Sequence, residues 1–266
     1  MYDYWRRQDA GKSLFDSQVD TLRPEQIQLA GKLAIVGGRA QAFFAVSSAF
    51  QVANATGIAE ATIILPDSLK NKIPNSENMR FLAAEASGGF AADALPDLLA
   101  ATRGVDAVLL VGDFGKSHET AMLLNDYLAQ TTAKVIMARD TVDLVMDRVA
   151  DWASRDGLTI CLSLKQLQKF TQQLYYPRMI TMTMPMNQIV EALHKMTLSI
   201  PATMITLGDG QIIVAEDGQV VSTPLQDTEW TSVAFWDGRL MARGAVLGIW
   251  NKTVSPLQVW SRAFLK

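Results

Sequence analysis

The chain has 266 residues, of which 49% are hydrophobic and 19% are charged, and this composition excludes an intrinsically disordered chain. Its 24 Lys and Arg residues and 27 Asp and Glu residues give a formal net charge of -3, so no overall field attracts the chain to nucleic acid or to an anionic membrane. The cysteine Cys161 stands alone and cannot form an intrachain disulfide, and with the two histidines His118 and His194 it cannot assemble a Cys/His metal cage. We therefore expect a globular protein of a reducing compartment, without a metal site of its own.

The N-terminal residues 1–12 contain no apolar stretch of the kind found in a signal peptide, so we expect a cytoplasmic protein. The longest uncharged stretch lies between Arg39 and Glu60, and polar residues interrupt it at Gln41, Ser47, Ser48, Gln51 and Asn54. A bilayer-spanning helix would not tolerate these interruptions. We interpret the stretch as a buried helix and expect no membrane partner.

Residues 1–31 are polar and mixed, and we treat them as an N-terminal extension ahead of a single domain at 32–266. The apolar run 33–36 predicts a buried strand that Gly37 and Gly38 stop. Residues 40–56 predict a helix that ends at Gly57, and residues 61–65 predict a second strand. The order is strand, helix, strand, which is typical of a parallel sheet.

The same alternation continues along the chain. Apolar runs predict strands at 107–111, 135–138, 158–162 and 178–184, and apolar residues three and four apart predict helices at 119–130, 142–153 and 164–174. Alternation this regular predicts an α/β fold with a mostly parallel, doubly wound sheet between two helix layers.

From residue 202 onward the pattern changes to short apolar segments. Strands are predicted at 204–207, 211–215 and 219–223, separated by turns at 208–210 and 217–218, so we expect a small antiparallel hairpin extension of the sheet. A last helix is predicted at 240–251.

Four glycine-bearing turns follow predicted strands or precede the last helix: Gly37 with Gly38, residues 112–115, residues 208–210, and Gly238. Ligands of open parallel sheets gather at the carboxyl ends of the strands, so these turns are the candidate site. Glycine in such a position is more often a tight-turn device than a phosphate cradle, and none of the four matches the P-loop or the dinucleotide fingerprint in full.

Two stretches together resemble a known family. Residues 107–144 read AVLLVGDFGKSHETAMLLNDYLAQTTAKVIMARDTVDL, and residues 33–66 read LAIVGGRAQAFFAVSSAFQVANATGIAEATIILP. Their order and spacing resemble the ADP- or ATP-dependent NAD(P)H-hydrate dehydratases of the ribokinase-like superfamily, in which a Gly-Pro-Gly-Leu-Gly turn follows one strand and Asp-Ala-Asp-Ala-Leu-Asn follows the next. The resemblance covers about residues 32–251 and implies a ribokinase-like α/β/α fold.

In that family a nucleotide phosphorylates the hydroxyl of a hydrated nicotinamide ring, and phosphate is then eliminated to restore NADH or NADPH. The resemblance implies ADP or ATP with Mg²⁺ as cofactor, a NAD(P)H-type dinucleotide as substrate or ligand, and a homotetramer. It also implies the residue roles, with Asp237 as catalytic base, Gly112, Gly115, Asp140, Gly208 and Gly210 around the nucleotide, and Gly37 and Gly38 at the substrate.

The sequence departs from the family where phosphate would bind. The family's Ala-Gly-x-Gly-Asp stretch falls on residues 233–237, where Ala234 and Trp236 replace the glycines and Phe235 lies between them, so side chains are expected where open backbone should meet phosphate. The turn His-Pro-Gly-Glu is replaced by residues 163–166 (SLKQ), and Lys-Gly-Ala-Gly appears at residues 207–210 without its lysine.

Our leading hypothesis is therefore a divergent dehydratase homologue whose phosphate site has decayed, leaving a non-catalytic or functionally altered protein. An active dehydratase with Asp237 as base is the alternative, although Asp followed by Gly is also a common turn pair. A module that binds a nucleotide without transforming it, and a purely structural oligomer, are two further alternatives.

Other motifs have simpler interpretations. Asp113, Phe114 and Gly115 match a kinase Asp-Phe-Gly, but the other kinase signatures are missing. His118 is interpreted as a capping or exposed residue, Cys161 as an inert core residue, and the methionines at 179, 182, 184 and 186 as core filling. The aromatic segments 2–7 and 260–265 are expected either to pack on a partner or to fold back on their own subunit.

Overall fold

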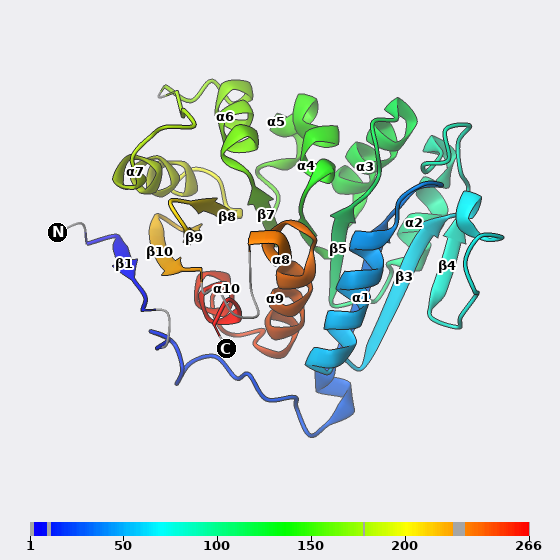
Figure 1. The fold of residues 1–266 in the computed structure, drawn as a ribbon, viewed down its shortest axis with the longest axis horizontal. Helices are drawn as coiled ribbons and strands as arrows, with labels where there is room; N and C mark the ends of the chain where they lie inside the picture. The colour runs from blue at the N-terminus through cyan, green and yellow to red at the C-terminus, as the bar shows by residue number, and fades with distance from the viewer. Residues whose placement is uncertain (1–2, 10–11, 178, 226–231, 266) are drawn as a thin grey trace.

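A computed structural model describes residues 3–9, 12–177, 179–225 and 232–265 of the chain. The described residues form one ten-stranded sheet with the strand order β1-β10-β9-β8-β7-β6-β5-β2-β3-β4 (Figure 1). The strands are β1 Trp5–Arg7, β2 Lys32–Gly37, β3 Glu60–Pro66, β4 Met79–Leu82, β5 Ala107–Gly112, β6 Lys134–Met137, β7 Leu158–Leu162, β8 Thr203–Gly208, β9 Gln211–Glu216 and β10 Gln219–Pro224.

Within this described sheet, β9 alone runs against the other strands, because β8 to β9 and β9 to β10 are its antiparallel pairs. The predicted parallel sheet and the predicted hairpin extension are both confirmed. Strand β1 was not predicted. It pairs in parallel with β10, which places the N-terminal aromatic segment on its own subunit.

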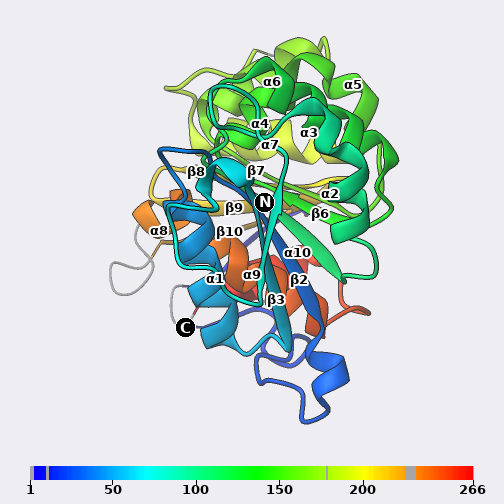
Figure 2. The same ribbon diagram turned by 90° about the vertical axis from the view of Figure 1, so that its right-hand side faces the viewer.

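Helices cover both faces of the sheet. They are α1 Phe44–Thr56, α2 Leu95–Ala101, α3 His118–Gln130, α4 Asp140–Val145, α5 Val149–Trp152, α6 Leu164–Gln173, α7 Met186–Thr197, α8 Ser232–Trp236, α9 Arg239–Trp250 and α10 Pro256–Ala263. In Figure 2 helices α2 to α7 lie on one side of the sheet and α1, α9 and α10 lie on the other. Short 3-10 helices occur at Ile27–Ala30, Asp67–Leu69, Ala92–Ala94 and Met146–Arg148.

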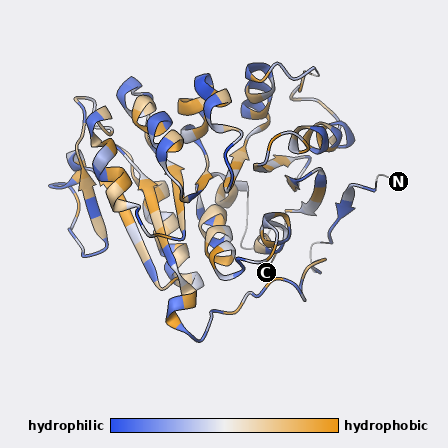
Figure 3. Ribbon diagram, turned by 180° about the vertical axis from the view of Figure 1, so that it is seen from behind, coloured by the Kyte–Doolittle hydropathy of each residue, from blue (hydrophilic) through white to orange (hydrophobic). Residues whose placement is uncertain are grey.

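Each face of the sheet has its own hydrophobic core, because side chains alternate between the two faces along a strand. Along β5, Val108 and Leu110 face helices α3 to α5, whereas Leu109 and Val111 face α1 and α9. The central strands are apolar at successive positions, as expected of strands buried on both faces, and Figure 3 shows them as hydrophobic segments beneath more hydrophilic helices.

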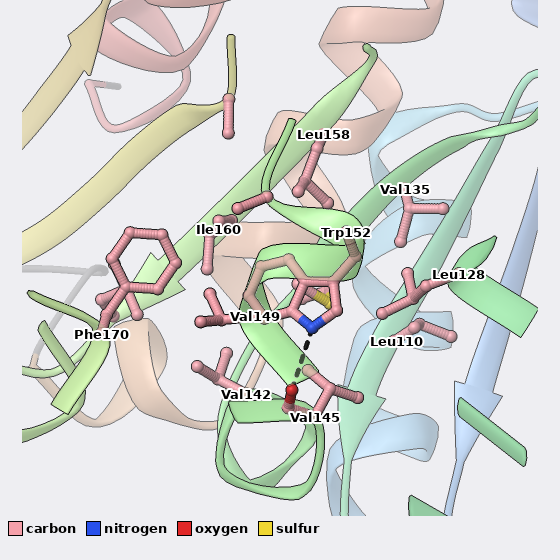
Figure 4. Close-up of a cluster of buried hydrophobic side chains, with 14 of the residues drawn as sticks. Leu110, Leu128, Val135, Val142, Val145, Val149, Trp152, Leu158, Ile160 and Phe170 are labelled. Carbon is pink, nitrogen blue, oxygen red and sulfur yellow. Dashed lines mark hydrogen bonds between the residues drawn. The ribbon is translucent and has the colours of Figure 1, made fainter. Parts of the chain in front are cut away.

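The first of these cores centres on Trp152 of α5, which is 1% exposed. Its ring lies among aliphatic side chains from β5, β6 and β7 (Figure 4), and its Nε1–H donates a 2.9 Å hydrogen bond to the carbonyl oxygen of Val145. That bond satisfies a polar group at the break between α4 and α5. The predicted continuous helix at 142–153 is thus observed as two short helices joined by a 3-10 turn.

The predicted strand at 178–184 is wrong. None of residues 179–184 belongs to a strand, and Met179 and Met182 are 63% and 59% exposed, so the expectation of core filling is wrong for these two methionines. The chain instead continues into α7, whose buried residues Ile189, Val190, Leu193 and Met196 repeat at helical spacing. The alternation of Met and Thr had the period of a strand, but no place in the sheet between β7 and β8 is free for it.

Candidate functional site

The candidate site lies where β2, β5 and β6 end and helices α1 and α9 begin. Gly37 and Gly112 are neighbours there, and a Cβ built on Gly37 would lie 2.3 Å from the carbonyl oxygen of Gly112. The N–H of Gly38 donates a 3.0 Å hydrogen bond to that same oxygen. The structure thus brings together the glycines predicted at the ends of two strands, and close approach of their backbones explains why glycine is needed.

Asp140, which was predicted near the nucleotide, accepts hydrogen bonds at both carboxylate oxygens from the turn after β5. Its Oδ1 accepts from the N–H of Asp113 and its Oδ2 accepts from the N–H of Gly115, each at 2.9 Å. Burial raises the pKa of Asp140, and the hydrogen bond from Gly115 and the charge of Arg139 oppose that increase. Two backbone amides that an anion could use on this turn, those of Asp113 and Gly115, are therefore already bonded within the protein.

An ion pair that the sequence analysis did not single out lies in the middle of the site. Arg139 Nη2 lies 2.6 Å from Asp113 Oδ1, with side-chain exposures of 29% and 10%. Arg139 Nη1 donates a 2.8 Å hydrogen bond to the carbonyl oxygen of Trp236, and Asp113 Oδ2 accepts a 2.8 Å hydrogen bond from the N–H of Ala45 at the start of α1. The guanidinium of Arg139 therefore links the ends of β5 and β6 to α8.

The backbone of this pair is strained. Asp113 has φ 61° and Arg139 has φ 60° with ψ -136°, a region that residues with side chains rarely adopt. Strain of this kind persists only where the surroundings impose it. Here the side chain of Gln166 supplies one restraint, because its Nε2 donates a 2.7 Å hydrogen bond to the carbonyl oxygen of Arg139.

Gln166 is itself fixed by the start of α6. Its side chain and Ser163 form a capping box, in which Ser163 Oγ accepts from the N–H of Gln166 and Gln166 Oε1 accepts from the N–H of Ser163. The turn that had lost every feature of the resembled family thus has a structural role of its own. It holds Arg139 in place.

Asp237, the predicted base, is 5% exposed and directly precedes α9. Its carboxylate accepts from the N–H of Arg239 at 3.1 Å and from Arg239 Nε at 2.8 Å. The next residue, Gly238, has φ 89°, and a Cβ there would lie 2.3 Å from Val111 Cγ2. The Asp-Gly pair therefore forms a tightly packed turn whose carboxylate is held by Arg239, the first residue of α9.

The residues at the position of the family's Ala-Gly-x-Gly-Asp stretch pack into the core: Ala234 is fully buried, and Trp236 is partly buried against the same core. Phe235 is fully buried and packs against Trp236 and Phe264, with ring centroids 4.6 and 6.4 Å away, so its side chain fills the core instead of the site. It is the guanidinium of Arg139 that lies against the carbonyl oxygen of Trp236. The segment 226–231, which precedes α8, lies outside the described residues.

The other predicted residues have simpler surroundings. Gly208 and Gly210 flank Asp209 in the β8–β9 hairpin, and no atom lies within 4 Å of a Cβ built on Gly210, so turn geometry accounts for this glycine. His118 is exposed at the start of α3. Cys161 is 1% exposed, which confirms its predicted place in the core, and burial raises the pKa of its thiol.

Among the described residues, no group of three or more His, Cys, Asp or Glu side chains could hold a metal ion. None of the helices in the described ranges combines the length and the hydropathy that crossing a bilayer requires.

Comparison with known proteins places the fold. No family model and no curated protein matches the sequence. A ribokinase-like superfamily protein from Enterococcus faecalis matches with TM-score 0.67 and 12% identity, covering 98% of this chain and 94% of its own. The ADP/ATP-dependent NAD(P)H-hydrate dehydratase from Bacillus subtilis, co-crystallised with ATP and Mg²⁺, matches with TM-score 0.60 and 12% identity over 92% of this chain and 82% of its own. A Bacillus subtilis pyridoxal kinase in complex with ADP matches with TM-score 0.53 and 12% identity over 88% of each chain.

The chain has a ribokinase-like fold. These likenesses confirm the predicted fold class, and at 12% identity they concern the fold alone.

Proposed function

We propose that this chain is a divergent relative of the NAD(P)H-hydrate dehydratases whose phosphate site is filled by its own side chains, so that it does not catalyse nucleotide-dependent dehydration. The observation that carries the proposal is the position of the Arg139 guanidinium, between Asp113 and the carbonyl oxygen of Trp236. A triphosphate bound at these turns would have to displace that pair and also compete with Asp140 for the amides of Asp113 and Gly115.

The charges around the site support the same proposal. The carboxylates of Asp113, Asp140 and Asp237 face the guanidinium groups of Arg139 and Arg239. The side chain of Arg39 covers the outside of the turn, since its Cδ would lie 3.0 Å from a Cβ on Gly115. Acidic and basic groups balance, so the site has no surplus positive charge to attract a polyphosphate. The residues present do not fit an ATP–Mg²⁺ complex, because their carboxylates and guanidinium groups are already paired with one another.

The first experiment is thermal unfolding with ATP, ADP, NAD⁺ and NADH, each with and without Mg²⁺. A ligand that binds the folded state at about 100 times its Kd stabilises it by about 2.7 kcal/mol, which raises the Tm of a chain of this size by about 5–10 °C. We expect no saturable shift for the wild-type protein. The variant Arg139→Gly frees the site and relieves the backbone strain, and we expect it to gain a shift with adenine nucleotides. Arg103→Gly, at an exposed position after α2, is the matched control and should gain none.

An active dehydratase is the second candidate, and the position of Asp237 beside Gly238, the N-cap of α9, favours it, because the resemblance places the catalytic base just before this helix. Turnover of hydrated NADH by the wild type, lost in Asp237→Asn, would establish this candidate and overturn the proposal. A saturable shift in the wild type without turnover would instead identify a nucleotide-binding module.

A homotetramer and a cytoplasmic location stay predictions, the first from the resemblance to the dehydratases and the second from the composition of residues 1–12. Light scattering coupled to size-exclusion chromatography measures the first directly, and a monomer at micromolar concentration would contradict it.

A further inference from the structure

A row of polar side chains crosses the sheet at the amino ends of β7 and β8, far from the turns described above. The register places Ile136 of β6 beside Thr159 of β7, and Thr159 beside Thr203 of β8. Thr203 Oγ1 donates a 3.1 Å hydrogen bond to Glu216 Oε1 at the end of β9. The row lies on the face covered by α9 and α10, where the next row along the strands is wholly apolar: Cys161, Ile205 and Val214.

A cavity of about 440 Å³ lies between this row and the two helices. Its apolar wall is formed by Ala245 and Ile249 of α9 and by Val259 and Trp260 of α10. The volume lies within the range of small-molecule sites, which is about 300–1,000 Å³. Since the cavity opens at the amino ends of the strands, it is separate from the candidate site at their carboxyl ends.

The polar row keeps hydrogen-bonding capacity that the protein does not use. Thr159 is 7% exposed, and its hydroxyl makes no hydrogen bond with any described residue. Thr203 is 2% exposed and donates its proton to Glu216, so the lone pairs of its oxygen stay available. Glu216 accepts one bond at each oxygen, from Thr203 and from the N–H of Leu257 at 2.8 Å, and a carboxylate can accept more.

Burying these oxygen atoms with unused hydrogen-bonding capacity costs free energy, and a ligand that donates hydrogen bonds to them would offset that cost. Burial raises the pKa of Glu216, and the negative charge of Asp217 acts in the same direction. At the mouth of the cavity, Lys252 Nζ lies 2.6 Å from Asp106 Oδ1, so these two charges cancel, and Lys134 is exposed. Glu216, which is half-buried, therefore places an acidic group beside the acceptor oxygens of the threonines, and its two hydrogen-bond partners are both neutral.

We propose that this cavity binds a small primary amine with an apolar body. The three N–H groups of the ammonium would face the oxygens of Thr159, Thr203 and Glu216, and the apolar body would lie against Ile249, Val259 and Trp260. This site is independent of the function proposed for the opposite edge of the sheet, so a failure of either proposal leaves the other intact.

Isothermal titration with three amines of increasing size tests the proposal: isopentylamine, cyclohexylamine and 2-phenylethylamine. We expect at least one to saturate a single site, with 2-phenylethanol, the neutral counterpart of the third, binding at least about tenfold more weakly. Failure of all three amines to saturate below about 10 mM would overturn the proposal, and so would equal affinity for the amine and the alcohol.

Two variants of the wall locate the binding. Glu216→Gln removes the charge and keeps the shape, and we expect a loss of affinity of at least about tenfold. Gly248→Leu places a side chain in the cavity, because the nearest atom to a Cβ at this position is Val259 Cγ1 at 3.9 Å, and we expect binding to be lost. Gly248→Ala is the control and should keep it. Wild-type affinity in both Glu216→Gln and Gly248→Leu would overturn the proposal, and if Glu216→Gln does not fold, Gly248→Leu against Gly248→Ala decides.

Discussion

Replacing glycine with alanine should have opposite effects on stability at two positions of α9, Gly244 and Gly248. A Cβ on Gly244 would lie 1.9 Å from Trp260 Cζ3, 2.3 Å from its Cε3 and 2.6 Å from its Cη2, whereas carbon atoms in contact are separated by about 3.5–4.0 Å. The ring cannot swing away, because Trp260 is 4% exposed and packs against Phe264. At Gly248 the nearest atom, Val259 Cγ1, lies 3.9 Å away, which is ordinary contact.

Alanine at either position gains about 1 kcal/mol of helix propensity over glycine. At Gly248 that gain is unopposed, so we expect Gly248→Ala to raise the free energy of unfolding by up to about 1 kcal/mol. At Gly244 the overlap with Trp260 adds a penalty of about 3 kcal/mol, the upper end of the usual range for overpacking, so Gly244→Ala should lower stability by about 2 kcal/mol.

Urea unfolding followed by far-UV circular dichroism measures both variants without relying on tryptophan fluorescence. The propensity gain is shared, so the difference between the two variants isolates the approach of α9 to Trp260 of α10. Equal stability of the two variants would refute the close packing of these helices and, with it, the shape of the cavity wall beside Gly248.

Three further results are expected. Trp152→Phe removes the Nε1–H bond to the carbonyl oxygen of Val145 and should lower the free energy of unfolding by about 1–3 kcal/mol in urea titrations, and an unchanged midpoint would contradict the role given to that bond. Cys161 should not react with a thiol reagent at pH 8 while the protein is folded, because burial raises its pKa, and rapid stoichiometric labelling would count against the buried position. Because the pKa of Glu216 is raised, its contribution to stability is complete below the unfolded value of about 4.3 and is lost as pH rises through the folded value, so Glu216→Gln should gain stability relative to wild type as pH rises above about 4.3; a difference independent of pH would show that its carboxyl group is solvated.

The parallel strands were predictable because they are buried on both faces and read as unbroken apolar runs. Strand β4 was missed because only Leu82 of its residues Met79–Leu82 is buried and the exposed Arg80 interrupts the apolar residues, which leaves no such run. Helix α7 was missed although its buried residues have helical spacing. The alternation of Met and Thr just before it has the period of a strand, and the methionine series that ends at Met186 was interpreted as part of that pattern.

The glycines of the candidate site could be predicted from the sequence, whereas the role of Arg139 could not. Glycines at strand ends indicate close backbone approach, and the structure brings Gly37 and Gly112 together as expected of a shared edge. The role of Arg139 depends on partners far away in the sequence, Asp113 and Trp236. It also depends on a positive φ, which cannot be predicted from the presence of an arginine. One signal was present: Arg139 stands at the position of the alanine between the two aspartates of the resembled family's motif.

The parallel pairing of β1 with β10 has a consequence for how the chain is synthesised. Trp5 lies beside Val220, and Gln8 Nε2 donates to the carbonyl oxygen of Ser261 at 2.9 Å. Strand β1 therefore finds these partners only after the residues from Gln8 to Ser261 have been translated. Until then its unpaired backbone edge and aromatic side chains are open to other nascent chains. Conditions that slow translation of the residues between β1 and β10 should thus favour aggregation of this protein.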